Sequence, residues 1–316
     1  MTLTAESRSV VRCRPRYEGS NIGTWIGFKQ LMLLTEEAVL QWFRDRGLGP
    51  RRLYHQHGLG LEVVDSSVQL PALLEVDDEV VADVVEARPG RFSVTLRTSR
   101  QGADVVVSRG RVTIALVREA EAAPRKPARA DAVPDLSPLV VADVAAATTV
   151  SSPGGRSIGP GEDEQAALTR SAPGAFAWSW RAPYFACHFS DRVQHSAFVR
   201  ALEDVVDRFL ADRGLSIATV LAERGWIPVV SRARVQLVAA AHMEETIHTV
   251  FAVDEVLKRS AYDARMDCYV RRGDALVRCA TARILHGYAV GRGFGAGSLV
   301  ELDDATVAAL TRAPAR

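Results

Sequence analysis

The chain is organised around residues 183–214, which read PYFACHFSDRVQHSAFVRALEDVVDRFLADRG. This stretch predicts a short strand, a turn that carries His188, and one amphipathic helix that ends at Gly214. A related stretch occurs earlier at a constant offset: residues 45–48 and 212–215 both read DRGL, which gives 212 − 45 = 167. Residues 68–70 and 235–237 both read VQL at the same offset, with no gap between the two matches. The sequence therefore predicts a duplicated domain, in which Asn21 corresponds to His188 and Glu36 to Glu203.

Length and composition are those of a soluble globular protein with room for two domains. The chain has 316 residues, of which 47% are hydrophobic and 24% are charged, and each half is long enough to bury its own core. The net charge of +1 gives no electrostatic reason to expect a nucleic-acid or an anionic membrane partner.

Localisation and cofactors are predicted from what the sequence lacks. The N-terminal residues have neither the basic nor the apolar region of a signal peptide, and no apolar run reaches the roughly 18 residues of a membrane span. The four cysteines form no CxxC pair, so we expect reduced thiols in a cytoplasmic protein. Neither half contains metal-ligand spacing, a phosphate-binding glycine loop or a GxSxG motif. We therefore expect no metal and no other cofactor.

Both halves predict the same order of elements. In the first half we expect a strand at 10–17, a turn at 18–25, a helix at 26–46, a loop around His55 and His57, and strands at 59–68, 79–86, 91–98 and 105–117. In the second half we expect a strand at 176–185, a turn at 187–194, a helix at 196–213, strands at 229–238, 246–253, 262–271 and 275–288, and a short helix within 301–312. Residues 1–120 form the first domain, and 174–316 form the second domain with its tail. Between them, residues 121–173 form an Ala/Pro/Gly-rich linker with a short ordered piece at 139–144.

A strand, a central helix and a curled antiparallel sheet, present twice, resemble a double hotdog fold of the α+β class. The second half also resembles the 4-hydroxybenzoyl-CoA thioesterase-like family of acyl-CoA and acyl-carrier-protein thioesterases. Residues 193–203, VQHSAFVRALE, are similar to that family's helix pattern Val-(Asn/Tyr)-(Asn/His)-x-x-(Tyr/Phe)-x-x-x-(Leu/Phe)-Glu. The resemblance implies two tandem hotdog domains, each an antiparallel sheet wrapped around a central helix.

The resemblance also implies two composite catalytic sites between the halves, each with a turn residue of one half and a helix carboxylate of the other. These pairs are His188 with Glu36, and Asn21 with Glu203. The N-terminus of a central helix can hold a thioester carbonyl and its developing oxyanion, because its first N–H groups have no helical acceptor. A nearby carboxylate or histidine can then activate water. Four residues are predicted to contact substrate: His195, Gly27, Phe28 and Tyr184.

The two predicted sites differ in their chemistry. On a helical wheel Glu36 lies within the apolar face of its helix, whereas Glu203 borders charged residues, so we expect the His188/Glu36 site to be the active one. His188 stands where relatives carry a catalytic aspartate. Imidazole cannot replace a carboxylate nucleophile, but it can act as a general base. Asn21 can only orient a carbonyl or a water molecule. The alternatives are a structural carboxylate for Glu36, a solvated helix edge for Glu203 and a plain turn residue for Asn21.

The predicted function is hydrolysis of an acyl-CoA or acyl-carrier-protein thioester, in polyketide, fatty-acid or other secondary metabolism. One alternative is a dehydratase or isomerase that acts on a 3-hydroxyacyl thioester. Residues 184–191, YFACHFSD, are similar to the Phe-Phe-x-Gly-His-Phe-Pro turn of fatty-acid dehydratases, and Glu36 would be the partner acid. The glycine before the histidine and the flanking proline are missing here.

Two further alternatives remain open. A polyketide-pathway acyltransferase or decarboxylase would form a covalent acyl-enzyme, for which Tyr54 or Cys187 are the candidate nucleophiles. A non-catalytic module would bind acyl thioesters without turnover. In every case the partner is a thioester on a pantetheine arm. We expect either a monomer with an internal pseudo-dimer or a homodimer.

Overall fold

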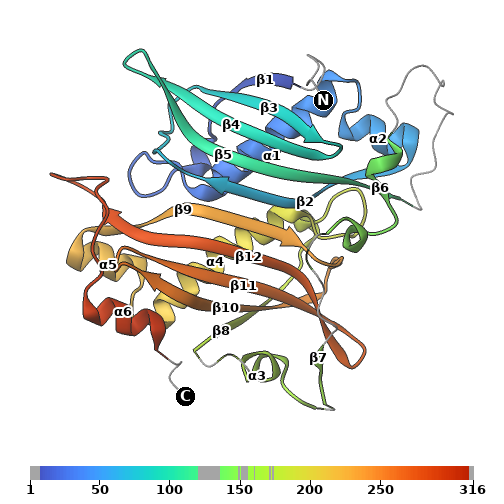
Figure 1. Ribbon diagram of the computed structural model, residues 1–316. Coiled ribbons are helices and arrows are strands. Elements are labelled where there is room, and N and C mark those ends of the chain that lie inside the picture. Colours follow the sequence, from blue (N-terminus) through green and yellow to red (C-terminus); the bar gives the residue numbers. More distant parts are fainter. Residues whose placement is uncertain are drawn as a thin grey trace.

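The computed structural model describes residues 8–119, 136–148, 150, 156–159, 161–170, 172 and 174–312. Two domains lie side by side and share one antiparallel sheet (Figure 1). The strand order is β1-β3-β4-β5-β2-β9-β12-β11-β10-β8, so the domains meet where β2 pairs with β9. This is the double hotdog architecture predicted from the repeat. Within the described part of the chain, no helix is long and apolar enough to cross a membrane.

Both domains contain a central helix with strands of the sheet curled around it. The first domain contains β1 (Arg8–Cys13), α1 (Phe28–Asp45), α2 (Pro50–His57), β2 (Leu59–Gln69), β3 (Val80–Arg88), β4 (Arg91–Arg100) and β5 (Ala103–Arg118). The second contains β8 (Phe176–Arg181), α4 (His195–Asp212), α5 (Ile217–Arg224), β9 (Trp226–Leu237), β10 (Thr246–Leu257), β11 (Ala261–Arg272), β12 (Ala275–Val290) and the terminal α6 (Asp304–Thr311). Short 3₁₀ turns at Tyr17–Gly19 and Tyr184–Ala186 precede the two central helices.

The repeat offset of 167 holds for both ends of three element pairs, one of which is the pair of 3₁₀ turns at Tyr17–Gly19 and Tyr184–Ala186. Adding it to α1 gives 28 + 167 = 195 and 45 + 167 = 212, which are the bounds of α4, and α2 maps in the same way onto α5. Gly47 and Gly214, one repeat apart, both follow a central helix with positive φ, 70° and 75°, which glycine adopts at little steric cost. Further along the chain the offset is 172. Equivalent hydrogen bonds show this: the N–H of Glu119 donates to the carbonyl of Gly58, and the N–H of Gly291 donates to the carbonyl of Gly225. The additional residues of the second domain therefore lie between β9 and β12.

Two helices, α2 and α5, were not predicted from the sequence, and two predicted strands are shorter than expected. The predicted loop around His55 and His57 is α2, which has Pro50 in its first turn and Gly58 in the left-handed conformation after its end. Proline at the start and glycine past the end are ordinary helix boundaries. The strand predicted at 10–17 ends at Cys13 and that at 176–185 ends at Arg181, because 3₁₀ turns follow. The helix α5, the repeat of α2, was also missed.

The predicted linker contains several short ordered pieces. Strand β6 (Val140–Val141) pairs in parallel with β5, and β7 (Arg156–Ser157) pairs with β12. The helix α3 (Glu164–Thr169) contacts β8 and β10. Val144 packs with buried valine and alanine side chains of β2 and β5. Residues 121–135, 149, 151–155, 160, 171 and 173 of the predicted linker lie outside the described residues.

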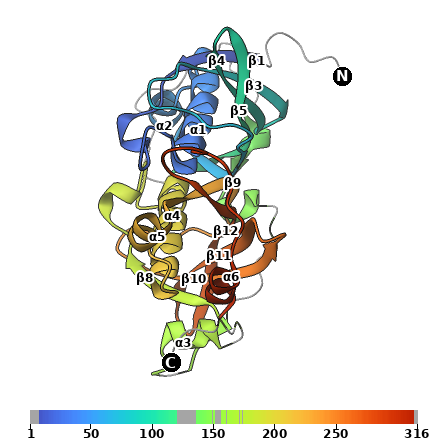
Figure 2. The same cartoon turned by 90° about the vertical axis from the view of Figure 1, so that its left-hand side faces the viewer.

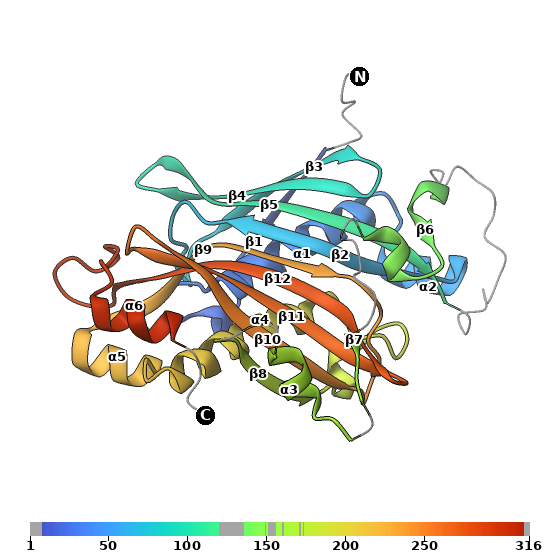
Figure 3. The ribbon, with the colours of Figure 1, turned by 60° about the horizontal axis from the view of Figure 1, so that its bottom comes forward.

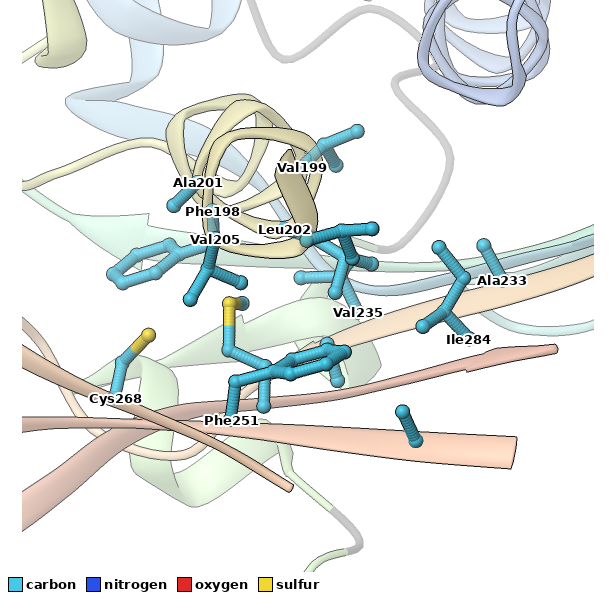
Figure 4. Packing of buried hydrophobic residues seen from close by; sticks show 14 of the residues in the cluster. Phe198, Val199, Ala201, Leu202, Val205, Ala233, Val235, Phe251, Cys268 and Ile284 are labelled. Carbon is cyan, nitrogen blue, oxygen red and sulfur yellow. The ribbon is translucent and has the colours of Figure 1, made fainter. Parts of the chain in front are cut away.

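The central helices lie on one side of the sheet and contact each other at the boundary between the domains (Figures 2 and 3). Helix α4 packs its apolar face onto its own sheet. Phe198, Leu202 and Val205 point towards side chains of the strands, including Phe251 and Val235 (Figure 4). Burial of such side chains supplies most of the free energy that holds helix and sheet together.

Gly110 on β5 allows the equivalent close approach of α1 in the first domain. A Cβ atom at this position would lie 2.5 Å from Cγ2 of Thr35, which is fully buried on α1. Cores are close-packed, so the helix could not accept this atom without moving.

We therefore expect Gly110→Ala to lower the free energy of unfolding by about 1–3 kcal/mol, as overpacking does. The second change Thr35→Ser removes Cγ2 but keeps the hydroxyl that donates to the carbonyl of Leu31, so the double variant should recover part of the loss. Urea denaturation of the wild type, both single variants and the double variant measures this. Equal stability of Gly110→Ala and wild type would contradict the packing argument.

Candidate active site

A cavity of about 1020 Å³ lies between the two domains. It is bounded by the turn before α1, the first turn of α1, the loop after β2, one face of α4 and parts of β9 and β12. Its lining includes the exposed apolar side chains Ile22, Leu73 and Leu299. The size and the apolar lining are those of a small-molecule site.

The cavity brings together one of the two predicted pairs, Asn21 and Glu203, with the predicted substrate contacts Gly27 and Phe28. Gly27 is the residue before α1, and a Cβ atom there would lie 2.9 Å from Oδ1 of Asn21. Glycine therefore allows the Asn21 amide to lie against the start of the helix. The N–H groups of Phe28 and Lys29, in the first turn of α1, have no helical acceptor. The cavity thus contains helix N–H donors, an amide and a carboxylate.

Glu203 is held at this helix end by an ion pair between the domains. Its Oε2 lies 2.5 Å from Nζ of Lys29. A lysine in the first turn of a helix is opposed by the helix dipole, and the carboxylate of the neighbouring helix offsets this. Positive charge therefore accumulates at the N-terminus of α1 next to a fixed carboxylate.

The other predicted pair, His188 with Glu36, does not form a contact within the part of the chain that the structure describes. Nε2 of His188 lies 3.0 Å from Oε2 of Glu62, a fully buried residue of β2. Arg192 also binds Glu62, with Nη2 3.0 Å from Oε1, and it contacts Glu119. Burial opposes the charge of Arg192, but the two carboxylates outweigh it and raise the pKa of the guanidinium. The turn that carries His188 is thus held by a buried ion network.

Glu36 instead contacts His195 across the boundary between the central helices. Oε1 of Glu36 lies 3.1 Å from Nδ1 of His195, and Nε2 of His195 lies 3.0 Å from the carbonyl oxygen of Val235. Both side chains are buried. Burial alone would lower the pKa of His195, but the charge of Glu36 and the hydrogen bond to the carbonyl of Val235 raise it above its ordinary value. Glu36 therefore lies on an apolar helix face, as expected, and is paired with an imidazole.

The repeat shows how the two predicted places differ in charge. Each charged residue of the network corresponds to an uncharged one in the other half, with the offsets 167 and 172: Glu62 to Val229, Arg192 to Trp25 and Glu119 to Gly291. Val229 and Trp25 line the cavity. The buried charges at one place therefore correspond to uncharged residues at the other, two of which line the cavity.

Sequence reasoning missed Glu62, Arg192 and Lys29. A lone carboxylate in the apolar run LGLEVV (59–64) is a usable signal, because a buried charge requires a partner. Of the remaining predicted residues, Tyr184 is 82% exposed in its 3₁₀ turn and is not among the residues that line the cavity. Burial and the nearby Asp191 raise the pKa of the Cys187 thiol, which disfavours the thiolate that a nucleophile requires.

Comparisons with known proteins agree with this architecture. Residues 180–310 match the family described as the thioesterase-like superfamily. The fold is similar to a 12:0-ACP thioesterase from Umbellularia californica (TM-score 0.57, 10% identity, 90% of this chain and 99% of that one). It is also similar to a protein designated an oleoyl thioesterase from Lactobacillus plantarum (TM-score 0.55, 13% identity, 90% and 97%). An acyl-ACP thioesterase from Bacteroides thetaiotaomicron is a further neighbour (TM-score 0.53, 11% identity, 90% and 100%). No curated protein sequence matches the chain.

The chain is therefore a double hotdog protein, and its second domain carries the sequence pattern of the thioesterase-like superfamily. Each of these alignments covers 90% of this chain and nearly all of the neighbour, so the likeness in fold extends over both domains.

The buried network around Arg192 predicts a large loss of stability when the cation is removed. Arg192→Leu would leave Glu62 and Glu119 buried without their partner, which costs about 3–5 kcal/mol. Arg234→Leu is the matched control, because Arg234 also joins the domains, 2.5 Å from Asp65, but is half exposed. We expect less than about 1 kcal/mol there. Similar losses for both variants in urea denaturation would contradict the assignment.

The Glu36–His195 pair predicts that stability decreases with rising pH. The folded protein holds the His195 proton more tightly than the unfolded chain, whose value is 6.5. The pair therefore stabilises fully below pH 6.5, and the contribution is lost as the pH rises through the folded pKa. We expect urea denaturation between pH 6.5 and the onset of thiol ionisation to show this decline in the wild type.

The double variant Glu36→Gln/His195→Phe, which copies Phe28 of the first domain and leaves no unpaired buried carboxylate, should lack that decline. His57, His248 and His286 have pKa values lowered by burial, so they affect stability only as the pH falls below about 6.5. A decline of equal slope in both proteins would show that another group causes it.

Proposed function

We propose that the protein hydrolyses an acyl-CoA or acyl-carrier-protein thioester in the cavity between its domains. The observation that supports this best is that Asn21, Glu203 and the N-terminus of α1 meet in one apolar cavity. The names of the structural neighbours, two of them acyl-ACP thioesterases, support the substrate class. A cytoplasmic role in polyketide, fatty-acid or other secondary metabolism remains a prediction of the sequence.

The proposed reaction uses only residues of this chain. The thioester carbonyl accepts hydrogen bonds from the first-turn N–H groups of α1, where Lys29 adds positive charge. Glu203 takes a proton from a water molecule, whose oxygen attacks the carbonyl carbon. The tetrahedral oxyanion then collapses, the C–S bond breaks and the sulfur takes up a proton, which releases acid and thiol. The Asn21 amide orients the carbonyl or the water.

The other reaction classes have less support from the contacts. A dehydratase would require His188 and Glu36 to act on one substrate, but each is engaged by a different residue, Glu62 and His195. An acyl-enzyme on Cys187 is disfavoured by the raised pKa of its thiol. A non-catalytic binding module would use the same cavity, so the turnover assay separates it from a thioesterase.

A second candidate base is His188, because its pair with Glu62 has the form of a histidine–carboxylate dyad. The imidazole is one-third exposed, and the buried carboxylate accepts a hydrogen bond from it at 3.0 Å. Such a pair fixes the orientation and the tautomer of the ring, so that its other nitrogen can take a proton from water. This dyad lies at the turn for which the sequence predicted catalysis.

We expect Glu203→Gln to lower kcat by at least about 100-fold, which is the usual loss of a general base. Glutamine keeps the size of the side chain but cannot take the proton. Release of free thiol from a panel of acyl-CoA and acyl-carrier-protein thioesters measures the rate. Glu37→Gln is the matched control, because Glu37 is paired on α1 with Arg44 at 2.5 Å and does not line the cavity.

The variant His188→Ala assigns the reaction to one of the two places. Full activity in Glu203→Gln together with its loss in His188→Ala would overturn the proposed site and move the chemistry to the His188–Glu62 dyad. Tight binding of a thioester without thiol release in the wild type would overturn hydrolysis itself.

A further inference from the structure

Three buried polar side chains lie together on the inner side of the second sheet: Tyr262 of β11, and His286 and Tyr288 of β12. Their exposed fractions are 0%, 3% and 1%. Nδ1 of His286 and both tyrosine hydroxyls have no hydrogen-bond partner among the described residues. The His286 ring centroid lies 4.9 Å from that of Tyr262 and 5.9 Å from that of Tyr288. We call these three residues the polar cluster.

The fold does not require polar side chains at these places. The offset of 172 relates His286 to Ile114 (286 − 172) and Tyr288 to Leu116 (288 − 172) in the first domain. Both counterparts are buried apolar residues of a complete hotdog core. A buried polar group without a partner destabilises a protein, whereas an apolar residue of similar shape there is neutral or stabilising. The second domain thus carries three groups that weaken its own core.

The polar cluster adjoins the cavity of the proposed active site. His286 lines it, together with Val206 of α4 and Val230, its partner on β9. The same cavity contains Gly27 and Glu203. A ligand in the cavity therefore extends between the start of α1 and the imidazole of His286.

The polar cluster is uncharged, which restricts what it can bind. Burial lowers the pKa of His286 to about 3 and raises those of Tyr262 and Tyr288. A neutral imidazole has one donor and one acceptor nitrogen, and a phenol hydroxyl both donates and accepts. A carboxylate or an ammonium group would lose its hydration there without an opposite charge. A neutral hydroxyl or keto oxygen has no charge, so its burial there does not require the loss of a charged group's hydration.

We propose that the acyl group of the substrate carries a neutral oxygen substituent, a hydroxyl or a keto group, which hydrogen-bonds to His286 within the polar cluster. This rests on the proposed function in so far as the acyl group occupies the cavity. The cavity thus selects oxygenated acyl groups over saturated alkyl chains of equal length.

The test compares binding of CoA thioethers, which the enzyme cannot hydrolyse. S-decyl-CoA is compared with a set of S-decyl-CoA analogues that carry one hydroxyl or one keto group at successive chain positions, using isothermal titration calorimetry. We expect at least one oxygenated analogue to bind the wild type about tenfold more tightly than S-decyl-CoA, which corresponds to one well-formed hydrogen bond. In His286→Ile, which copies Ile114, that preference should disappear while S-decyl-CoA binds as tightly as before or more tightly.

Tyr288→Phe is the second variant, because it removes one oxygen and keeps the packing of the ring. It should bind the preferred analogue less tightly than the wild type and unfold at the same temperature or a higher one, since an unpaired buried hydroxyl is lost. If His286→Ile does not fold, Tyr288→Phe still tests the proposal. A merely structural role of the polar cluster would lower the unfolding temperature in both variants and leave the ratio of the two dissociation constants unchanged.

The outcomes separate this proposal from the proposed function. If S-decyl-CoA binds the wild type and no oxygenated analogue binds more tightly, the oxygen preference is overturned and the active site stands. If a preference exists but survives in every variant that folds, it does not arise at the polar cluster. If neither series binds, either on CoA or as the same thioethers on an acyl carrier protein, the cavity is not an acyl site and both proposals are overturned. A preference that His286→Ile removes supports the proposal even if thiol release is never observed.

Discussion

The pairing of β2 with β9 is the interaction on which the rest of the structure depends. Asp65 pairs with Gln236 and Gln69 with Arg232, so the ladder is symmetric about Ser67 and Arg234, which pair with each other. Those two central residues are one repeat apart, because 67 + 167 = 234. A pseudo-two-fold axis therefore passes between them, and it places α1 beside α4 with each helix start facing the opposite domain. The two composite sites are a direct consequence of this strand pairing.

The repeat made the fold predictable, because an offset carries information over the whole chain. It relates the two central helices at both ends, and one glycine after each helix marks where it stops. The same offset would have found α5 from α2, but the helix itself was missed. His55 and His57, the residues singled out there, are no helix signal, whereas Pro50 and Gly58 are. Local signals define boundaries only when they are read together with the apolar pattern.

The site was less predictable, because it depends on contacts between residues far apart in the sequence. The position of Glu36 on an apolar helix face was correctly inferred from periodicity, but its partner His195 was assigned to the substrate. His188 was singled out by the turn that carries it, and its partner Glu62 lies on a strand of the other domain. Helix periodicity predicts on which face of a helix a side chain lies. Which residues of the other domain contact that face depends on the strand pairing between the domains. The pairing expected for Asn21 and Glu203 is compatible with the structure because both lie at the start of α1.

Duplication followed by divergence gives the two halves different tasks at equivalent positions. Buried ion pairs require complete partners, and the network of Glu62, Arg192 and Glu119 has them, so it ties the two domains together beside the turn of His188. At the other place the same backbone carries smaller or apolar residues, and a cavity results. His286 lines its inner end, and the unpaired buried atoms of the adjoining polar cluster reduce stability. The ion network stabilises one place, and the unpaired polar groups lie beside the cavity at the other. A single hotdog domain paired with an identical copy could not combine the two, because both of its places would be the same.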